Sequence, residues 1–452
     1  MKLSFSLDKI SRTLTPSQAD REKEKGLIND ILETIKSLPE ASEVEPVLVG
    51  SIAKDTDLHS SKDIDVFLLF NKSVSRESLE RKGLDIGKKT FQKLGSEWEL
   101  AYSEHPYTKG NYRGFILEIV PCYRIKYGES IQSAVDRSPL HTKYVIERLS
   151  EEPKLKTEIR LFKQFMKANG LYGANAAVEG FSGYLCELLI LYYGSFSKTV
   201  EAIGSWEENE TLRLDPDMPK NASFQEPLIV IDPVDYNRNV AAAVSIENMA
   251  KSVVVARRFL DNPSKEFFVF KEPKPMSKAQ FKRNQQQRGT ELAVVMFPVP
   301  EMLEDTLVSQ LNKSLKSLAK HVVEKDFRIS KKGMCTDGRN AFLILEMEVS
   351  KLPDIEVKTG PRFDSSKQNR DGFLQKNKPN ALGSPYIKND RFAIDVKRKY
   401  REIHAYLKHF MSRPLGFGKN IRENKEFKIY CANRVTEIKN ETFWKYMSTF
   451  WD

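Results

Sequence analysis

Two adjacent motifs constrain this chain more than any other feature of its sequence. Val47-Leu48-Val49 is typical of a short apolar strand and ends at Gly50-Ser51, and residues 63–70 are typical of a second strand rich in Val, Ile, Leu and Phe. Because side chains alternate between the two faces of a strand, Asp63 and Asp65 point the same way. Two carboxylates side by side repel each other unless a cation lies between them, and hard oxygen ligands favour magnesium. The pattern therefore predicts a Mg²⁺ site on this strand.

The turn between the two strands has the chemistry of a phosphate-binding loop. Gly50 lets backbone amides approach a phosphate closely, and a helix that begins there adds a favourable dipole. Ser51 can donate a hydrogen bond to a phosphate oxygen, and Lys54 lies one turn further on. Taken alone, a Gly-Ser pair means nothing, and an Asp-x-Asp at a strand end is often a solvated edge. Joined by the short connection of residues 52–62, the two motifs predict a metal-dependent nucleotide site.

Composition and charge narrow the class of protein. The chain has 452 residues, enough for three or four domains, and a net charge of +10 that favours a polyanionic partner, nucleic acid before membrane. Its four cysteines form no Cys-x-x-Cys pair, which argues against a zinc site or a disulfide framework and favours a reducing compartment. Residues 1–15 lack the apolar core of a signal peptide, and no run of about 18 apolar residues is present to span a membrane. We therefore expect a cytoplasmic protein without a membrane partner.

The spacing of apolar residues divides the chain into segments. The first ~145 residues are typical of a mixed α/β domain, with Thr15 as the N-cap of a helix and Pro16 as its first residue. Residues 142–260 are mostly helical in pattern, and a basic surface stretch follows over residues 271–288. Further helices are predicted at residues 75–94 and 307–323, and further strands at residues 98–103, 115–123, 293–297, 342–349 and 391–396.

The arrangement of Gly-Ser, a spacer and two acids flanking one residue resembles the motif of the polymerase-β-type nucleotidyltransferase superfamily. Further stretches resemble the archaeal-type (class I) CCA-adding enzymes, which are tRNA nucleotidyltransferases. These stretches are Glu118–Tyr123, Asp136–His141, Arg160–Lys163, Gly180–Glu187, Asp232–Asp235, Arg238–Ala242, Gly360-Pro361 with Phe363, and Gly418–Asn420. The similarity is dense over residues 45–260 and thinner beyond them.

The resemblance implies an α/β plus α+β multidomain fold with four parts. A polymerase-β-like catalytic head takes residues 1–144, and a helical, nucleotide-selecting neck takes residues 145–255. An α/β body is formed by residues 256–308 and 399–452, and a tail that binds the tRNA arm takes residues 309–398.

The resemblance also implies roles for three acidic residues. Asp63 and Asp65 match the family's catalytic, metal-binding acids. Glu118 falls where the third catalytic and metal-binding acid is commonly Asp, and its side chain is one methylene longer. We expect all three to bind Mg²⁺.

The residues that match the family's nucleotide-binding positions are Gly50, Ser51, Lys54, His141, Lys163, Tyr172 and Arg238. Ser51 matches a triphosphate-binding serine. Lys54 stands where an arginine is frequent, so it offers a point charge rather than a two-pronged donor. Lys163 and Tyr172 match neck residues that hold the triphosphate and the sugar, and Arg238 matches the arginine that presents hydrogen bonds to the incoming base.

The implied activity is the addition of C, C and A to the 3′ end of tRNA. ATP and CTP are the implied substrates, no nucleic-acid template is used, and pyrophosphate is released. The implied partner is the acceptor and TΨC arm of tRNA, and the resemblance also implies a homodimer. Two alternatives stay open: a poly(A) polymerase or other terminal nucleotidyltransferase with the same head, and a noncatalytic RNA-binding protein with a degenerate head.

Overall fold

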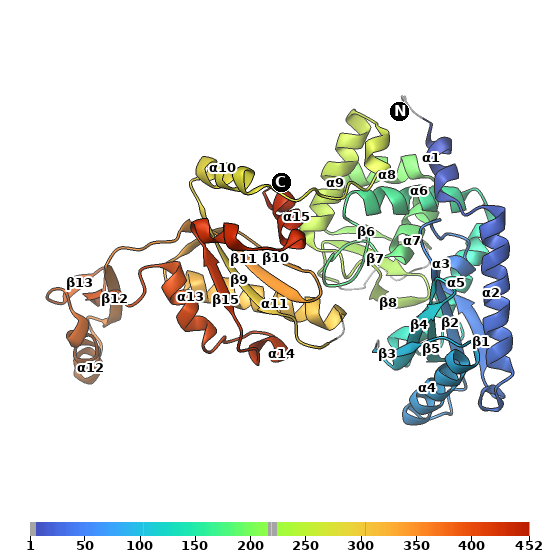
Figure 1. The fold of residues 1–452 in the computed structure, drawn as a ribbon, viewed down its shortest axis with the longest axis horizontal. Helices are drawn as coiled ribbons and strands as arrows, with labels where there is room; N and C mark the ends of the chain where they lie inside the picture. The colour runs from blue at the N-terminus through green and yellow to red at the C-terminus, as the bar shows by residue number, and fades with distance from the viewer. Residues whose placement is uncertain (1–5, 103, 216–217, 219–223, 303, 452) are drawn as a thin grey trace. The chain divides into compact units, whose positions relative to one another are not determined.

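The computed structural model describes residues 6–102, 104–215, 218, 224–302 and 304–451 (Figure 1). The chain forms two compact units, residues 1–271 and residues 272–452, and each is described by itself. Over the described residues, no helix is both long enough and apolar enough to cross a membrane.

The first part of unit 1 is a five-stranded sheet with the strand order β1-β2-β5-β4-β3. Its strands are β1 (Glu45–Val49), β2 (Asp63–Phe70), β3 (Trp98–Tyr102), β4 (Pro106–Tyr112) and β5 (Phe115–Tyr123). Four of them confirm predicted strands, although residue 103, at the end of the third, lies outside the described residues. The sequence did not predict β4, because its Pro, Lys, Gly and Asn residues are depleted in strands.

One face of this sheet carries the core. Ile64 and Val66 of β2 and Leu117 of β5 are buried against α2 (Gln18–Lys36) and α4 (Arg76–Lys93). The predicted helix start at Thr15 is wrong. Thr15 is instead the C-cap of α1 (Leu7–Leu14), and α2 begins after Ser17, whose side chain forms a capping box with Asp20. A serine followed three residues later by an acid satisfies two free backbone donors, so it outcompetes the Thr-Pro pair.

The rest of unit 1 is mostly helical, as predicted. Its helices are α5 (Arg137–Glu151), α6 (Leu155–Ala168), α7 (Gly183–Tyr193), α8 (Phe196–Ser205) and α9 (Ile246–Asp261). Phe165, Phe196 and Phe259 contact one another edge to face within its core. A small sheet that the sequence did not predict, β6 (Glu210–Leu212), β7 (Leu228–Asp232) and β8 (Asp235–Asn239), lies within the helical part.

Unit 2 is built on a four-stranded antiparallel sheet with the order β10-β11-β9-β15. The strands are β9 (Glu291–Pro298), β10 (Arg328–Thr336), β11 (Asn340–Val349) and β15 (Lys428–Cys431). Successive residues of β11 are buried on opposite faces of the sheet. Leu343 packs against α11 (Glu304–Val323) and α13 (Ile403–Met411), whereas Ile344 packs against α10 (Lys278–Arg288) and α15 (Glu441–Phe450). This sheet takes strands from residues predicted as body and as tail, and the domain boundaries stay predictions.

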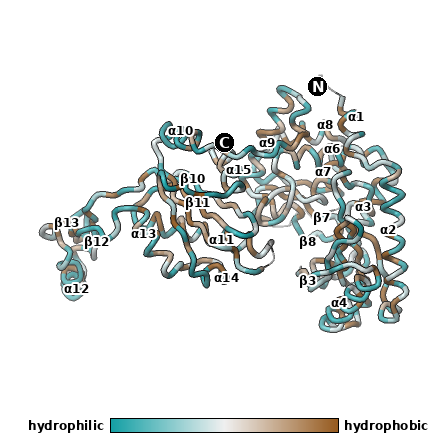
Figure 2. Tube along the Cα trace, in the orientation of Figure 1, coloured by the Kyte–Doolittle hydropathy of each residue, from teal (hydrophilic) through white to brown (hydrophobic). Residues whose placement is uncertain are grey.

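A second, smaller sheet in unit 2 is formed by residues 355–397, which we call the β12–β14 segment. It contains β12 (Ile355–Arg362), α12 (Lys367–Asn377), β13 (Tyr386–Lys388) and β14 (Arg391–Lys397), with the strand order β12-β14-β13. No residue of α12 is buried, and its chain is mostly hydrophilic in Figure 2.

Candidate active site

The pairing of β2 with β5 brings the three predicted acids together. The two strands run parallel, with Asp65 opposite Glu118 and Asp63 opposite Ile116. Because Ile64 and Leu117 point into the core, these acids lie on the other face of the sheet. Asp63 is exposed, and Asp65 and Glu118 are half-buried.

The surroundings of Asp65 perturb its ionisation. Burial, followed by the negative charges of Glu118 and Asp63, raises the pKa of Asp65 to about 7. On β4, Lys109 lies directly opposite Glu118, and its Nζ is 3.0 Å from Glu118 Oε1. Lys109 was not among the predicted site residues, because the polar strand that carries it was not predicted.

This donor set suits a hard divalent cation. Three carboxylates share this face of the sheet, and carboxylate oxygens are the ligands that such a cation prefers. In their present positions, no three acidic, His or Cys side chains of the described chain are arranged to hold an ion. Glu118 is paired with Lys109 instead. The residues therefore fit a divalent cation by chemical type and by shared face.

The predicted phosphate-binding turn lies against the acids. Gly50 begins the one-turn helix α3 (Gly50–Ala53) with a φ of +78°. A Cβ at this position would overlap Asp65 Oδ2, so glycine is required both for the backbone conformation and for the close approach. Ser51 is the second residue of α3 and is half-buried.

A cavity of about 330 Å³ opens beside these residues. Five predicted site residues line it: Gly50, Lys54, Asp65, Glu118 and His141. The other lining residues are Val49, Phe67, Tyr107, Val120, Val135, Ser138, Thr142 and Tyr184. The predicted residues Ser51, Asp63, Lys163, Tyr172 and Arg238 are not part of its lining.

Two of the predicted lysines share one buried carboxylate. Glu187 of α7 accepts hydrogen bonds from Lys54 Nζ (2.6 Å) and from Lys163 Nζ (2.8 Å). Thr56 Oγ1 also donates to Glu187, at 2.6 Å. Burial alone would raise the pKa of the Glu187 carboxyl, but the charges and hydrogen bonds of Lys163 and Lys54 lower it to about 2.

A second buried carboxylate, Asp232 at the end of β7, holds two further predicted residues. Its Oδ2 lies 2.8 Å from His141 Nε2 and accepts a hydrogen bond from Arg238 at 2.8 Å. His141 also stacks on Tyr184, with ring centroids 3.9 Å apart. Burial lowers the pKa of His141, and the hydrogen bond to Asp232 opposes that shift.

Glu187 and Asp232 were not among the predicted site residues. Glu187 stands inside the apolar run Leu185–Ile190, and Asp232 ends the apolar run that begins at Leu228. Both are fully buried in the structure. A carboxylate inside an apolar run needs a cationic partner when buried, and that is the signal that could have found them. Tyr172, the remaining predicted neck residue, is half-buried. Its hydroxyl lies so close to Gly183 that a Cβ added to this glycine would be only 2.8 Å from it.

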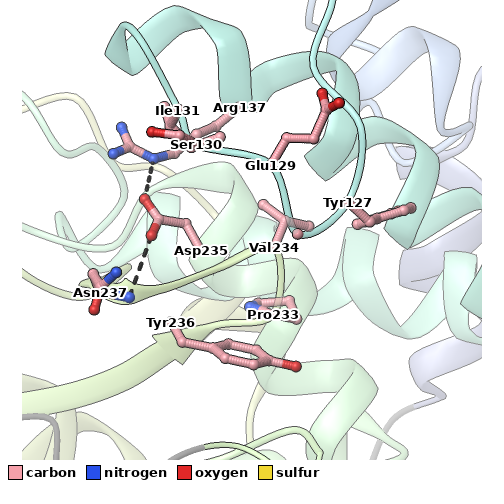
Figure 3. A pocket seen from close by; sticks show the side chains of 11 residues that line it. Tyr127, Glu129, Ser130, Ile131, Arg137, Pro233, Val234, Asp235, Tyr236 and Asn237 are labelled. Atoms are coloured by element: carbon pink, nitrogen blue, oxygen red, sulfur yellow. Dashed lines mark hydrogen bonds and ion pairs between the residues drawn. The ribbon is translucent and has the colours of Figure 1, made fainter.

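A second cavity, of about 720 Å³, is shown in Figure 3. Its walls are residues 127–131, Arg137 and residues 233–237. Arg137 Nε donates to Asp235 Oδ2 at 2.7 Å, and the backbone amide of Asn237 donates to the other oxygen of Asp235 at 3.3 Å. No predicted site residue lines this cavity.

Comparison with known proteins places this site in a family. Three protein-family models match successive parts of the chain. They are a nucleotidyltransferase domain over residues 28–141, the second domain of tRNA nucleotidyltransferase over residues 157–269, and the C-terminal domain of CCA-adding enzyme over residues 288–432. The first of these covers the acids and the phosphate-binding turn, and the second covers Lys163, Glu187 and Arg238.

Curated relatives match nearly the whole chain. The CCA-adding enzyme of Methanoregula boonei is 34% identical over 451 residues, which cover 99% of this chain and 95% of the relative. The CCA-adding enzyme of Methanocaldococcus jannaschii is 37% identical over 408 residues, with 88% of each chain covered. The CCA-adding enzyme of Methanothermobacter thermautotrophicus is 34% identical over 450 residues, covering 98% of this chain and 96% of the relative. This chain therefore belongs to the family of CCA-adding enzymes, the archaeal-type tRNA nucleotidyltransferases.

Proposed function

We propose that this protein adds C, C and A in turn to the 3′ end of tRNA, using CTP and ATP and no nucleic-acid template. The observation that carries the proposal is the position of Asp65. It has Glu118 beside it across two parallel strands and Gly50 in close contact with its carboxylate. Acids and a phosphate-binding turn at this distance suit the transfer of a nucleotide to a hydroxyl group.

In this proposal Asp63, Asp65 and Glu118 hold Mg²⁺. Bound there, the cation would supply charge neutralisation and acidify the 3′-hydroxyl of the RNA. The chain's own residues position the reactants. Gly50 lets the phosphates approach the backbone, Ser51 donates to them, and the 3′-hydroxyl attacks the α-phosphorus as pyrophosphate leaves.

We assign the cationic and neck residues to the nucleotide. Lys54, which faces the cavity, contacts the triphosphate. Lys163 supports the triphosphate through the Glu187 carboxylate that it shares with Lys54, and Tyr172 supports the sugar. His141 contacts the nucleotide from the cavity wall. Arg238, 36% exposed and held by Asp232, presents its remaining guanidinium donors to the edge of the incoming base.

The basic part of unit 2 is proposed to bind the acceptor and TΨC arm of tRNA. The β12–β14 segment holds nine Lys and Arg residues against five Asp and Glu residues. Contacts of Lys and Arg side chains with phosphates recognise the shape and backbone of an RNA helix rather than its sequence. A homodimer and a cytoplasmic location belong to the same proposal.

The experiment that tests this function uses tRNAs ending one, two or three residues short of CCA. The protein is incubated with Mg²⁺, CTP and ATP, and the 3′ ends are sequenced. Restoration of CCA on every substrate, without further extension, is the expected result. A long homopolymer would instead identify a poly(A) polymerase or another terminal nucleotidyltransferase. No extension and no pyrophosphate release would identify a noncatalytic RNA-binding protein.

A further inference from the structure

Glu187 lies at the meeting point of three elements of unit 1. It occupies the middle of α7 and is 0% exposed. Its carboxylate contacts Lys54 at the end of α3, Thr56 just beyond it, and Lys163 on α6. Lys54 and Thr56 belong to the part of the chain matched as a nucleotidyltransferase domain, whereas Lys163 and Glu187 belong to the part matched as the second domain. One carboxylate therefore joins the two matched domains, and one of its partners, Lys54, lines the cavity.

The two lysines use their donors differently. Lys163 Nζ donates to Glu187 Oε1 and, at 3.1 Å each, to the backbone carbonyl and Oγ1 of Thr56. A lysine ammonium has three N–H donors, so all of them have protein acceptors. Among the described residues, Lys54 Nζ donates only to Glu187 Oε2, and it lies over the Tyr184 ring at 5.8 Å. Because Lys54 also lines the cavity, its two other donors remain available to an anion there.

The charges explain why a buried carboxylate stands between these lysines. Two buried ammonium groups next to each other would repel, and each would lose its hydration. With Glu187 between them the cluster is hydrogen-bonded and keeps a net charge of +1 beside the cavity. Without Glu187, Lys54 would have no buried partner to hold its ammonium at the cavity wall.

We propose that Glu187 is a positioning residue that holds the Lys54 ammonium where it meets the phosphates of the incoming nucleoside triphosphate. Lys163 acts through the same carboxylate, as the second cation that fixes its orientation. This inference rests on the proposed function, because it takes the cavity to be the triphosphate site. It predicts that Glu187 and Lys54 act as one unit in nucleotide binding.

The test is a double-mutant cycle with Glu187→Gln, Lys54→Met and the double variant. The steady-state assay is the addition of AMP from ATP to a tRNA that ends in CC. Either single change should raise KM for ATP by about 10-fold or more and change kcat by less than about 3-fold. The KM of the double variant should be no higher than that of the single variant with the higher KM, because the two residues supply one interaction. A purely structural role would lower kcat and thermal stability together and leave no selective change in KM.

Glu158→Gln is the matched control. Glu158 is a half-buried carboxylate on α6 that accepts a hydrogen bond from the Phe196 amide and does not line the cavity. Its KM for ATP should equal that of the wild type. If Glu187→Gln does not fold, Glu187→Asp is the variant that tests the proposal, because it keeps the negative charge but shortens the side chain that contacts the two lysines. A raised KM with kcat retained supports the proposal, and an unchanged KM overturns it.

Two outcomes separate this inference from the proposed function. If the wild type restores CCA but the Glu187 and Lys54 effects multiply in the double variant, only the positioning role is wrong. The same holds if Glu187→Gln lowers kcat with KM unchanged. If the wild type itself adds nothing to a shortened tRNA, the proposed function is wrong.

Discussion

The five-stranded sheet of unit 1 and the β12–β14 segment of unit 2 differ in how far their side chains are buried. In the first, β2 and β5 are buried on one face by helices and carry Asp65 and Glu118 on the other. In the second, only three sheet residues are buried, Ala393, Ile394 and Val396, and α12 buries none. Large apolar side chains such as Phe363, which is 55% exposed, face solvent.

The contrast corresponds to two different physical demands. Catalytic groups must be held within a fraction of an ångström, so they require a scaffold that is fixed by packing from behind. Contacts to a phosphate backbone tolerate movement, because they act through charge over several ångströms. The sheet of unit 1 meets the first demand, and the exposed, basic β12–β14 segment suits the second. Four predictions test this division.

The largest effect is expected from Asp65→Ala. Removing the central carboxylate should lower the rate of nucleotide addition by about 1,000-fold or more, because metal binding and charge stabilisation at the reacting phosphate are lost together. The affinity for tRNA should stay within about 2-fold of the wild type, because phosphate contacts elsewhere supply it. Single-turnover rates and filter binding measure the two quantities. A variant that still adds nucleotides at a wild-type rate would remove Asp65 from the site.

The next effect is expected from Gly50→Ala. The added methyl group would overlap Asp65 Oδ2, and displacing that carboxylate should lower kcat by about 100-fold. Gly95→Ala is the matched control: Gly95 also has a positive φ, +65°, but a Cβ there meets nothing within 4 Å. Both variants therefore carry similar backbone strain, and only Gly50→Ala should lose activity beyond its loss of stability. Equal losses in the two variants would mean that the contact with Asp65 is unimportant.

A smaller effect concerns stability and pH in the absence of metal. The pKa of Asp65 is about 7 in the folded protein, above its ordinary value of 3.8, so the folded state binds the extra proton between these values. At low pH, where Asp65 is protonated, the folded protein keeps its full free energy of unfolding. Part of that free energy is lost as the pH rises through about 7 and the buried carboxyl ionises. Asp65→Asn, which cannot ionise, should be more stable than the wild type by about 2 kcal/mol at pH 8 and equal to it near pH 3.5.

Denaturant unfolding with a chelator present measures that difference. Adding Mg²⁺ should then stabilise the wild type more than Asp65→Asn, since the cation relieves the same repulsion. A difference between the two proteins that does not change with pH would contradict the electrostatic explanation for this acidic face.

The smallest effect is expected in the β12–β14 segment. Lys367, Lys376 and Lys378 are exposed, and no ion pair to them is found in the described structure. Changing all three to Gln should weaken tRNA binding about 10-fold near 0.1 M salt and reduce the slope of log Kd against log salt by about 2. The rate of addition at saturating tRNA should not change.

The control for this triple variant lies on α2. Lys23, Lys25 and Lys36 are also exposed, and changing them to Gln removes the same total charge from the part of the chain that holds the catalytic sheet. If both triple variants lose affinity equally, tRNA responds to net charge alone, and the β12–β14 segment has no special part in binding.

Much of the site could be predicted from local rules. The alternation of side chains along β2 placed Asp63 and Asp65 on one face, and apolar strands on both sides of Gly50 placed a turn there. The polar composition of β4 hid that strand and, with it, Lys109. The motif around Asp232 and Arg238 was visible in the sequence, but the small sheet that holds it was not predicted.

By itself, the sequence determined four of the five strands and most of the helices of the catalytic part, the shared direction of Asp63 and Asp65, and the resemblance that led to the family. Only the tertiary structure decided that Glu118 lies beside Asp65, because that depends on the register of two parallel strands far apart in the chain. It also decided that Lys54 and Lys163, both predicted to contact phosphate, share the Glu187 carboxylate. Alternation along a strand is a local property. Which charges share one buried site depends on how distant elements pack together, because a buried charge must find its partner there.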